Sequence, residues 1–404
     1  MSAAERLNSA HDLTIATERL FDGHGFQENR RVSIRDGIIR DVSPDTGPVP
    51  PGAFLRLKPG VTLAPGLIDL QVNGGGGVLL NDDVSLAAIR TIAEAHHRFG
   101  VTGLLPTLIT DSNDRLERLA AIASEAMTIP GVLGFHLEGP HLNRQRRGIH
   151  PERHIRPMTS ASLALLARFG RIGRSMVTVA PECLHERAIR MLVDAGLRVS
   201  IGHSEATAAQ MRKAVEEGAS SVTHLFNAML QMTPREPGVV GATLADDGLF
   251  AGIIADGQHV APDNLRVAWK AKGTDRLILV SDAMALVGTD RTFFPLQGRL
   301  ITLAEGRLTD ETDTLAGAHL DMLAAVRNMV SLAGVPLHDA LVMASGTPAA
   351  YLGLGDRLGA IKPGYQAELM AFDRDFQSQP HLTTGSDASR DPLTAIRASV
   401  LPCI

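Results

Sequence analysis

Acidic and imidazole side chains stand at the ends of four short apolar runs in this 404-residue sequence. Glu138 closes "GVLGFHLE", His203 closes "RVSIGH", His224 lies in "SVTHLF" and Asp282 closes "LILVSD". One carboxylate and two imidazoles, with a fourth position open, are the usual ligands of a catalytic zinc site. An aspartate beside such an ion suits a general base that takes a proton from the attacking water. Each residue alone would often be a salt-bridge partner or a structural residue, but together they predict metal-dependent hydrolysis.

The stretch "PGLIDLQVNGGGG", residues 65–77, carries amides where many metal-dependent hydrolases carry His-x-His. Gln71 and Asn73 are two residues apart, so in a strand they point to the same face. Their amides are poor ligands for a zinc-like ion. We therefore expect Gln71 and Asn73, together with His136 two residues before Glu138, to support the ligand residues rather than to bind the ion.

A polar segment, "NAMLQMTPREPGVVGA" at residues 227–242, suggests an anionic substrate. Asn227 and Ala228 offer side-chain and backbone N–H groups, and Arg235 offers a guanidinium. An arginine together with N–H groups in a loop is one way to hold a phosphate. Alone, Arg235 would be an ordinary surface residue.

The elements that must position these residues alternate along the chain. Eight apolar runs, most of them separated by helical patterns with apolar residues three and four apart, predict a parallel sheet. Eight such units over about 290 residues predict a closed (β/α)₈ barrel, with polar residues at the carboxyl ends of its strands on the catalytic face. An open doubly wound sheet is the alternative, but no G-x-G-x-x-G follows the first run.

The segments on either side of the barrel have strand and turn character. Residues 12–60 contain "RDGIIRDV", in which Asp-Gly between apolar runs is a hairpin signal. We expect residues 1–61 to form one part of a small β-sandwich, residues 62–356 the barrel, and residues 357–404 the rest of the sandwich and a tail. Residues 285–317 look irregular, and the tail from residue 374 lacks the alternating final strand expected of such a module.

Composition excludes several classes of function. A net charge of −5, one Trp and two Tyr argue against nucleic-acid binding. No run approaches the ~20 apolar residues of a membrane span. Two cysteines, Cys183 and Cys403, offer neither a disulfide framework nor a zinc-thiolate site. With no signal pattern at the N-terminus, a cytoplasmic location is expected by default. We read His11, His24, His96 and His97 as surface residues.

The sequence resembles the N-acetylglucosamine-6-phosphate deacetylases of the amidohydrolase superfamily. The motifs that carry the resemblance cover about residues 15–375: "PGLIDLQVNG", "GFHLEGPHLN", "GIHP", "SIGHSEAT", "THLFNAM", "REPGVVGA", "IIADGQHV", "LVSDAM" and "TLAGAHLDM". The resemblance implies a (β/α)₈ barrel with a flanking β-sandwich, usually as a homodimer. Members with Gln-x-Asn in place of His-x-His keep one metal, so the position formed by Glu138, His203 and His224 is expected to remain.

The resemblance also implies a reaction and roles for residues. The reaction is hydrolysis of the acetamide of N-acetyl-D-glucosamine 6-phosphate to glucosamine 6-phosphate and acetate, a step of amino sugar catabolism. Asp282 matches the catalytic base and acid. His150, in "RRGIHPERH", matches a residue that helps to polarise the amide carbonyl, and His259, in "ADGQHVAP", matches a sugar-hydroxyl contact. Taken alone, either histidine would more often be a surface or structural residue.

Phosphate recognition and specificity follow from the same resemblance. Asn227 and Ala228 match phosphate contacts, and Arg235 matches an arginine that reaches the active site of the neighbouring subunit. The ion is one divalent metal per subunit, with Zn²⁺ preferred and Fe²⁺, Co²⁺ or Mn²⁺ open. Three alternatives stay open: deacetylation of N-acetylgalactosamine 6-phosphate, another amidohydrolase acting on a phosphorylated N-acyl substrate or a cyclic amide, and a non-enzymatic sugar-phosphate binder.

Overall fold

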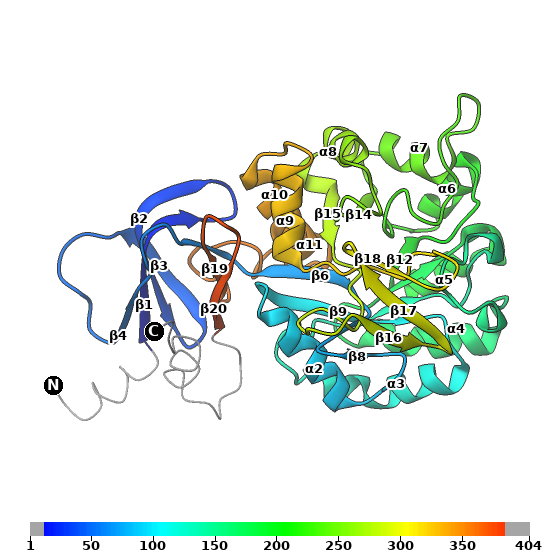
Figure 1. The fold of residues 1–404 in the computed structure, drawn as a ribbon, viewed down its shortest axis with the longest axis horizontal. Coiled ribbons are helices and arrows are strands. Elements are labelled where there is room, and N and C mark those ends of the chain that lie inside the picture. The colour runs from blue at the N-terminus through cyan, green and yellow to red at the C-terminus, as the bar shows by residue number, and fades with distance from the viewer. Residues whose placement is uncertain (1–11, 384–404) are drawn as a thin grey trace.

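A parallel barrel and a flanking sheet make up the computed structural model, which describes residues 12–383 (Figure 1). Eight parallel strands neighbour one another in the order β15-β14-β13-β12-β11-β10-β9-β6. Their bounds are β6 (Leu67–Val72), β9 (Val101–Ile109), β10 (His136–Glu138), β11 (Met176–Val179), β12 (Arg198–Ile201), β13 (Ser221–Val222), β14 (Phe250–Ile254) and β15 (Leu277–Val280). The predicted barrel fold is confirmed.

The ring of strands closes between β6 and β15. A parallel backbone bridge joins Val72, the last residue of β6, to Ala283, three residues past the end of β15. The carboxylate of Asp69 accepts a hydrogen bond from the backbone N–H of Ser281 at 3.2 Å. Asp69 is fully buried, and burial raises its pKa to about 7. The first and last strands are therefore tied together immediately below the residues predicted to be catalytic.

Helices cover the outside of the barrel (Figure 1). They are α2 (Leu86–His97), α3 (Asn113–Ala126), α4 (Ser160–Ala167), α5 (Ala188–Asp194), α6 (Ala208–Glu216), α7 (Gly238–Ala245), α8 (Pro262–Arg276), α9 (Met322–Ser331), α10 (Leu337–Ala344) and α11 (Gly346–Tyr351). Several begin at side-chain caps, as where Thr207 accepts from the N–H of Gln210 at the start of α6. Short 3₁₀ turns lie in the connections: η2 (Arg144–Arg146), η3 (Glu152–His154), η4 (Arg168–Arg171) and η5 (Pro181–Cys183). No helix within residues 12–383 is both long enough and apolar enough to cross a membrane.

Segments from both ends of the chain meet in one seven-stranded sheet. Its order is β20-β19-β5-β1-β2-β3, with β4 paired to β1. The strands are β1 (Asp12–Phe21), β2 (Phe26–Arg35), β3 (Ile38–Pro44), β4 (Ala53–Arg56), β5 (Thr62–Pro65), β19 (Glu368–Phe372) and β20 (Ser378–Thr383). Asp36 and Gly37 join β2 to β3 with φ of 51° and 72°, as a two-residue hairpin turn requires. The flanking β module built from both ends of the chain is confirmed.

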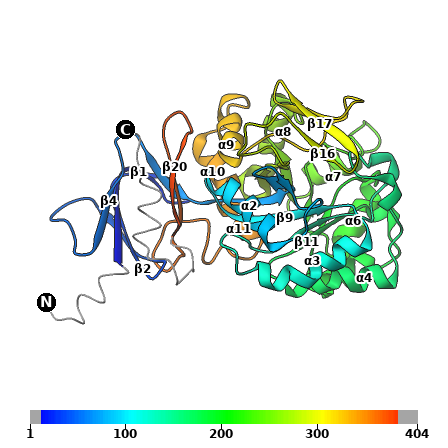
Figure 2. The ribbon, with the colours of Figure 1, turned by 60° about the horizontal axis from the view of Figure 1, so that its bottom comes forward.

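Two expectations about irregular segments were wrong. The described part of the tail forms β20, which pairs antiparallel with β19, while residues 384–404 lie outside the described residues. The β20 sequence "SQPHLT" contains proline and lacks alternation, features that an edge strand tolerates. Residues 285–317 contain a three-stranded sheet, β16 (Phe293–Leu296), β17 (Arg299–Ala304) and β18 (Arg307–Thr309). Its hairpins turn at Gln-Gly and Glu-Gly pairs with positive φ, a signal that was overlooked. Figure 2 shows β16 and β17 on the barrel, on the side away from the flanking sheet.

Candidate active site

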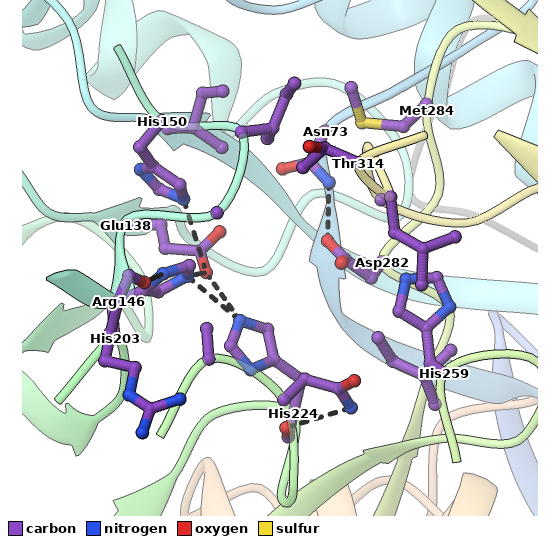
Figure 3. Close-up of a pocket in the computed structure, with 18 of the residues that line it drawn as sticks. Asn73, Glu138, Arg146, His150, His203, His224, His259, Asp282, Met284 and Thr314 are labelled. Atoms are coloured by element: carbon purple, nitrogen blue, oxygen red, sulfur yellow. Dashed lines mark hydrogen bonds and ion pairs between the residues drawn. The ribbon is translucent and has the colours of Figure 1, made fainter. Parts of the chain in front are cut away.

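A pocket of about 330 Å³ opens at the carboxyl ends of the barrel strands (Figure 3). This volume is at the lower end of the range for small-molecule sites. Its lining includes these predicted residues: Asn73, Glu138, His150, His203, His224, Asn227, Ala228, His259 and Asp282. Asn73 and Asp282, which are 209 positions apart in sequence, are in direct contact there.

Three acceptor atoms converge at one point in this pocket. The Nδ1–H of His203 donates to the carbonyl oxygen of Arg146 at 2.8 Å, which leaves Nε2 without a proton in the neutral ring. That Nε2 lies 3.0 Å from Glu138 Oε1, and Nε2 of His224 lies 3.1 Å from the same oxygen and 3.1 Å from Nε2 of His203. Lone pairs at these distances repel one another unless a proton or a cation lies between them.

The electrostatics of this cluster favour a positive charge. Burial opposes ionisation of Glu138, yet contact with the imidazoles of His203 and His224 holds its pKa well below the usual range. Burial also opposes the charged form of His224, but contact with Glu138 raises its pKa overall. A carboxylate and two imidazoles suit a divalent ion such as Zn²⁺. The donor set of Glu138, His203 and His224 therefore fits the metal implied by the sequence. A nitrogen of His150 also lies within 4.8 Å of ligand atoms of Glu138 and His203, and its Nε2 is 3.9 Å from Glu138 Oε1.

The amides of Gln71 and Asn73 hold the two carboxylates of the site. Gln71 Nε2 donates to Glu138 Oε2 at 3.2 Å and to Asp282 Oδ1 at 3.0 Å. Asn73 Nδ2 donates to the same oxygen of Asp282 at 2.7 Å. At the positions where His-x-His hydrolases carry two imidazoles, this protein therefore has amide N–H groups that donate to the carboxylates of Glu138 and Asp282. This contact pattern is what a supporting role requires of these two residues.

Asp282 is placed and tuned as a proton acceptor. It lies two residues past the end of β15 and adopts a left-handed backbone, with φ of 51°. Burial, and secondarily the charge of Glu138, raise its pKa to about 6, although the hydrogen bond from Asn73 lowers it. A carboxylate with this pKa is mostly ionised at neutral pH and is a stronger base than an exposed aspartate.

Hydrogen bonds fix the two further histidines of the pocket. Nδ1 of His150 lies 2.8 Å from the hydroxyl of Thr110, and burial lowers the pKa of His150 to about 3, so the ring is neutral. The single proton of the Thr110 hydroxyl has two acceptors in reach, Nδ1 of His150 and the carbonyl oxygen of Glu138 at 3.2 Å, and the His150 ring carries its proton on Nε2 only when the hydroxyl donates to Nδ1. Nδ1 of His259 lies 2.6 Å from Asp256 Oδ2, which orients that ring and leaves Nε2 free to accept a hydrogen bond.

Two of the three predicted phosphate contacts line the pocket, and the third does not. Asn227 and Ala228 line the pocket, and Ala228 has a left-handed backbone with φ of 51°. Arg235 is exposed and does not line the pocket of its own chain. Arg146, which was not predicted, does line it, and its side chain pairs with Glu205. The basic run "RQRR" was the signal that could have indicated Arg146.

Other supporting residues were missed or misread. Glu182, after β11, accepts from Asn143 Nδ2 at 2.9 Å and from the Ser204 hydroxyl at 2.7 Å, so it joins the loops on either side of the cluster. The expectation that His96 is a surface residue was wrong. It is fully buried, and its Nε2 lies 2.9 Å from the carbonyl oxygen of Gly74, beside the glycine-rich turn. His136 lies inside the barrel, 2.7 Å from the Thr178 hydroxyl.

Comparison with known proteins agrees with the resemblance. The amidohydrolase family model matches residues 62–393. The N-acetylgalactosamine-6-phosphate deacetylase of Shewanella sp. (strain ANA-3) is 42% identical over 322 residues, 79% of this chain and 81% of that protein. The N-acetylglucosamine-6-phosphate deacetylase of Haemophilus influenzae is 37% identical over 323 residues, 79% of this chain and 84% of that protein.

A solved structure extends the similarity to the whole fold. The crystal structure of N-acetylglucosamine-6-phosphate deacetylase from Pasteurella multocida matches with a TM-score of 0.89 and 33% identity, over 93% of this chain and 98% of that chain. The match includes the flanking sheet as well as the barrel, since it covers nearly all of both chains. The chain therefore belongs to the amidohydrolase family, together with its amino sugar 6-phosphate deacetylases.

Proposed function

We propose that this enzyme hydrolyses the acetamide of N-acetyl-D-glucosamine 6-phosphate to D-glucosamine 6-phosphate and acetate. The observation that carries the proposal is the pairing of Asp282 with the acceptor cluster of Glu138, His203 and His224 in one pocket. The relative from Haemophilus influenzae and the structure from Pasteurella multocida, both N-acetylglucosamine-6-phosphate deacetylases, support the choice of substrate.

The residues of the pocket divide the reaction among them. Glu138, His203 and His224 would hold one divalent ion, for which we propose Zn²⁺. When bound, such an ion supplies Lewis acidity toward a carbonyl and lowers the pKa of water. Asp282 takes a proton from the attacking water and returns it to the departing amine nitrogen. Neutral His150 stabilises the developing charge on the carbonyl oxygen when its Nε2 carries the proton.

The remainder of the substrate is held at the edge of the pocket. His259 Nε2 accepts from a sugar hydroxyl, because its Nδ1 is committed to Asp256. Asn227 and the backbone of Ala228 donate to the phosphate. The exposed Arg235 supplies a positive charge to the phosphate in the active site of a second subunit, and we therefore propose a homodimer. A cytoplasmic location remains a prediction, to be tested by fractionation.

A second candidate substrate is the galacto epimer, N-acetyl-D-galactosamine 6-phosphate. The 42% identity to an N-acetylgalactosamine-6-phosphate deacetylase favours it. The two sugars differ in the configuration of one hydroxyl, which the acceptor cluster and Asp282 do not contact in this mechanism. The epimer question therefore concerns the sugar-binding edge of the pocket and leaves the chemistry unchanged.

One experiment tests the function and ranks the epimers. Chelator-stripped protein receives one equivalent of Zn²⁺, and acetate release is measured from both epimeric phosphates and from N-acetylglucosamine without phosphate. We expect turnover that requires the ion and the phosphate, with a higher kcat/KM for the gluco epimer. A preference for the galacto epimer would make the second candidate the function, and no release from any substrate would refute the deacetylase proposal.

A further inference from the structure

Four apolar side chains that line the active-site pocket belong to one hydrophobic cluster or adjoin it: Ile109, Ile149 and Met284 pack in the cluster, and Leu315 precedes its member Ala316. We call this set the acyl wall. Ile109 ends β9, Ile149 precedes His150, Met284 follows Asp282 by two residues, and Leu315 lies in the connection after β18. The mechanism proposed above uses none of the four. An apolar surface beside charged and amide side chains indicates that an apolar part of the substrate binds against it.

The acyl wall is backed by packed side chains. Ile109 and Met284 are buried, at 4% and 2% exposure, in a hydrophobic cluster with Phe294, Leu296 and Ile301 of the small sheet β16–β18. A Cβ added at Gly317, which also lines the pocket, would lie 2.6 Å from Met284 Cγ and 2.9 Å from the carbonyl oxygen of Asp282. The wall has little room to yield, because a packed core resists added volume.

The position of the acyl wall determines which part of the substrate it meets. The reacting carbonyl carbon must lie between Asp282 and the acceptor cluster. Figure 3 shows Met284 and Thr314 beside Asn73, across the pocket from His224, where the phosphate-binding segment begins. The amide nitrogen leads back to the sugar and the phosphate. The remaining substituent on the carbonyl carbon, the methyl of the acetyl group, therefore faces the wall.

We propose that the acyl wall selects substrates by the length of the N-acyl group, admitting acetyl and discriminating against longer chains. This inference rests on the proposed deacetylase function and adds an acyl specificity to it. One methylene in a rigid apolar pocket changes kcat/KM by about 10- to 200-fold. We expect the native enzyme to lose at least about tenfold in kcat/KM from N-acetyl to N-propionyl glucosamine 6-phosphate, and more to N-butyryl.

Substitutions in the wall test the proposal. Met284→Ala and Leu315→Ala remove volume that faces the pocket, and each is expected to raise the butyryl-to-acetyl ratio of kcat/KM by at least about tenfold. Leu315 is partly exposed in a connecting loop, so its variant retains the fold if Met284→Ala does not. Leu303→Ala is the matched control, since Leu303 packs against the same cluster but does not line the pocket.

The outcomes separate this inference from the function on which it rests. Release of acetate by the native enzyme supports the function, whatever the longer substrates do. Equal kcat/KM for the three acyl groups would overturn the acyl wall, as would an unchanged ratio in both wall variants or an equal change in Leu303→Ala. No release of any acyl group by native enzyme would overturn the function, and the acyl specificity with it.

Discussion

Replacing Asn73 by leucine should shift the pH dependence of the reaction toward alkaline pH. The variant keeps the number and branching of the side-chain heavy atoms and removes the N–H group that donates to Asp282 Oδ1 at 2.7 Å. Hydrogen bonds to a charged group contribute about 1.5–3 kcal/mol. Since one pKa unit corresponds to about 1.4 kcal/mol, the pKa of Asp282 should rise by about one to two units.

The sign of this effect determines where activity is lost. A raised pKa means that Asp282 stays protonated, and inactive as a base, up to a higher pH. The acid limb of kcat/KM should therefore move up by about one to two pH units, with about 10- to 100-fold loss below it. At pH values where Asp282 is ionised in both proteins the loss should be small.

The assay is kcat/KM for N-acetylglucosamine 6-phosphate measured across the pH range at saturating metal. Asn328→Leu is the control, because Asn328 Nδ2 donates to the carbonyl oxygen of Ala255 at 2.9 Å and lies outside the pocket lining. It should leave the acid limb unchanged. A uniform loss at every pH in Asn73→Leu, or an acid limb that does not move, would refute the view that Asn73 stabilises the ionised form of Asp282.

Three further predictions concern other parts of the site. Thr110→Val should lower kcat by about tenfold or more, because the His150 ring loses the hydroxyl 2.8 Å from Nδ1, while Thr110→Ser should retain most of it; equal losses would exclude the hydroxyl. Chelation should abolish acetate release and lower Tm, and one equivalent of Zn²⁺ should restore both; an unchanged Tm would argue against a tight site. Mixing inactive Arg235→Met with inactive Asp282→Asn should restore about a quarter of native activity, since half of randomly mixed dimers carry one complete site; no recovery would place Arg235 outside the partner's site.

Regular patterns explain why the barrel was predictable. Its strands are short apolar runs that end in chemistry-bearing side chains, and periodicity of this kind is set locally. The edge strand β20 and the sheet β16–β18 were missed because their pairing depends on partners rather than on alternation. His96 was misread for a similar reason: an imidazole in an amphipathic helix gives no sign that it packs against the carbonyl of Gly74.

In the site, too, residues set by the local pattern were predictable, and residues whose role depends on a distant partner were not. Residues at strand ends were found because the barrel brings strand ends together. Thr110 and Glu182 were not, because a threonine in a strand or a glutamate in a turn is ordinary until its partner is known. Those partners are His150, 40 residues away, and Asn143, 39 residues away. Metal analysis of the native protein tests the prediction, made from residue types and spacing, that Glu138, His203 and His224 bind the ion.

The left-handed backbone conformations that follow three barrel strands lower the free energy of unfolding of the protein. His203, His224 and Asp282 have φ of 49°, 33° and 51°, conformations that cost non-glycine residues of the order of 1–3 kcal/mol each. The packing of the rest of the fold must hold these residues in the left-handed conformation. Part of the stability that packing provides is therefore offset by the strain that directs the three side chains toward one point. His203→Gly, although inactive, should then resist urea better than the native chain when both lack metal. These three turns therefore lower the stability of the metal-free protein by the same conformations that orient its predicted ligand and base side chains.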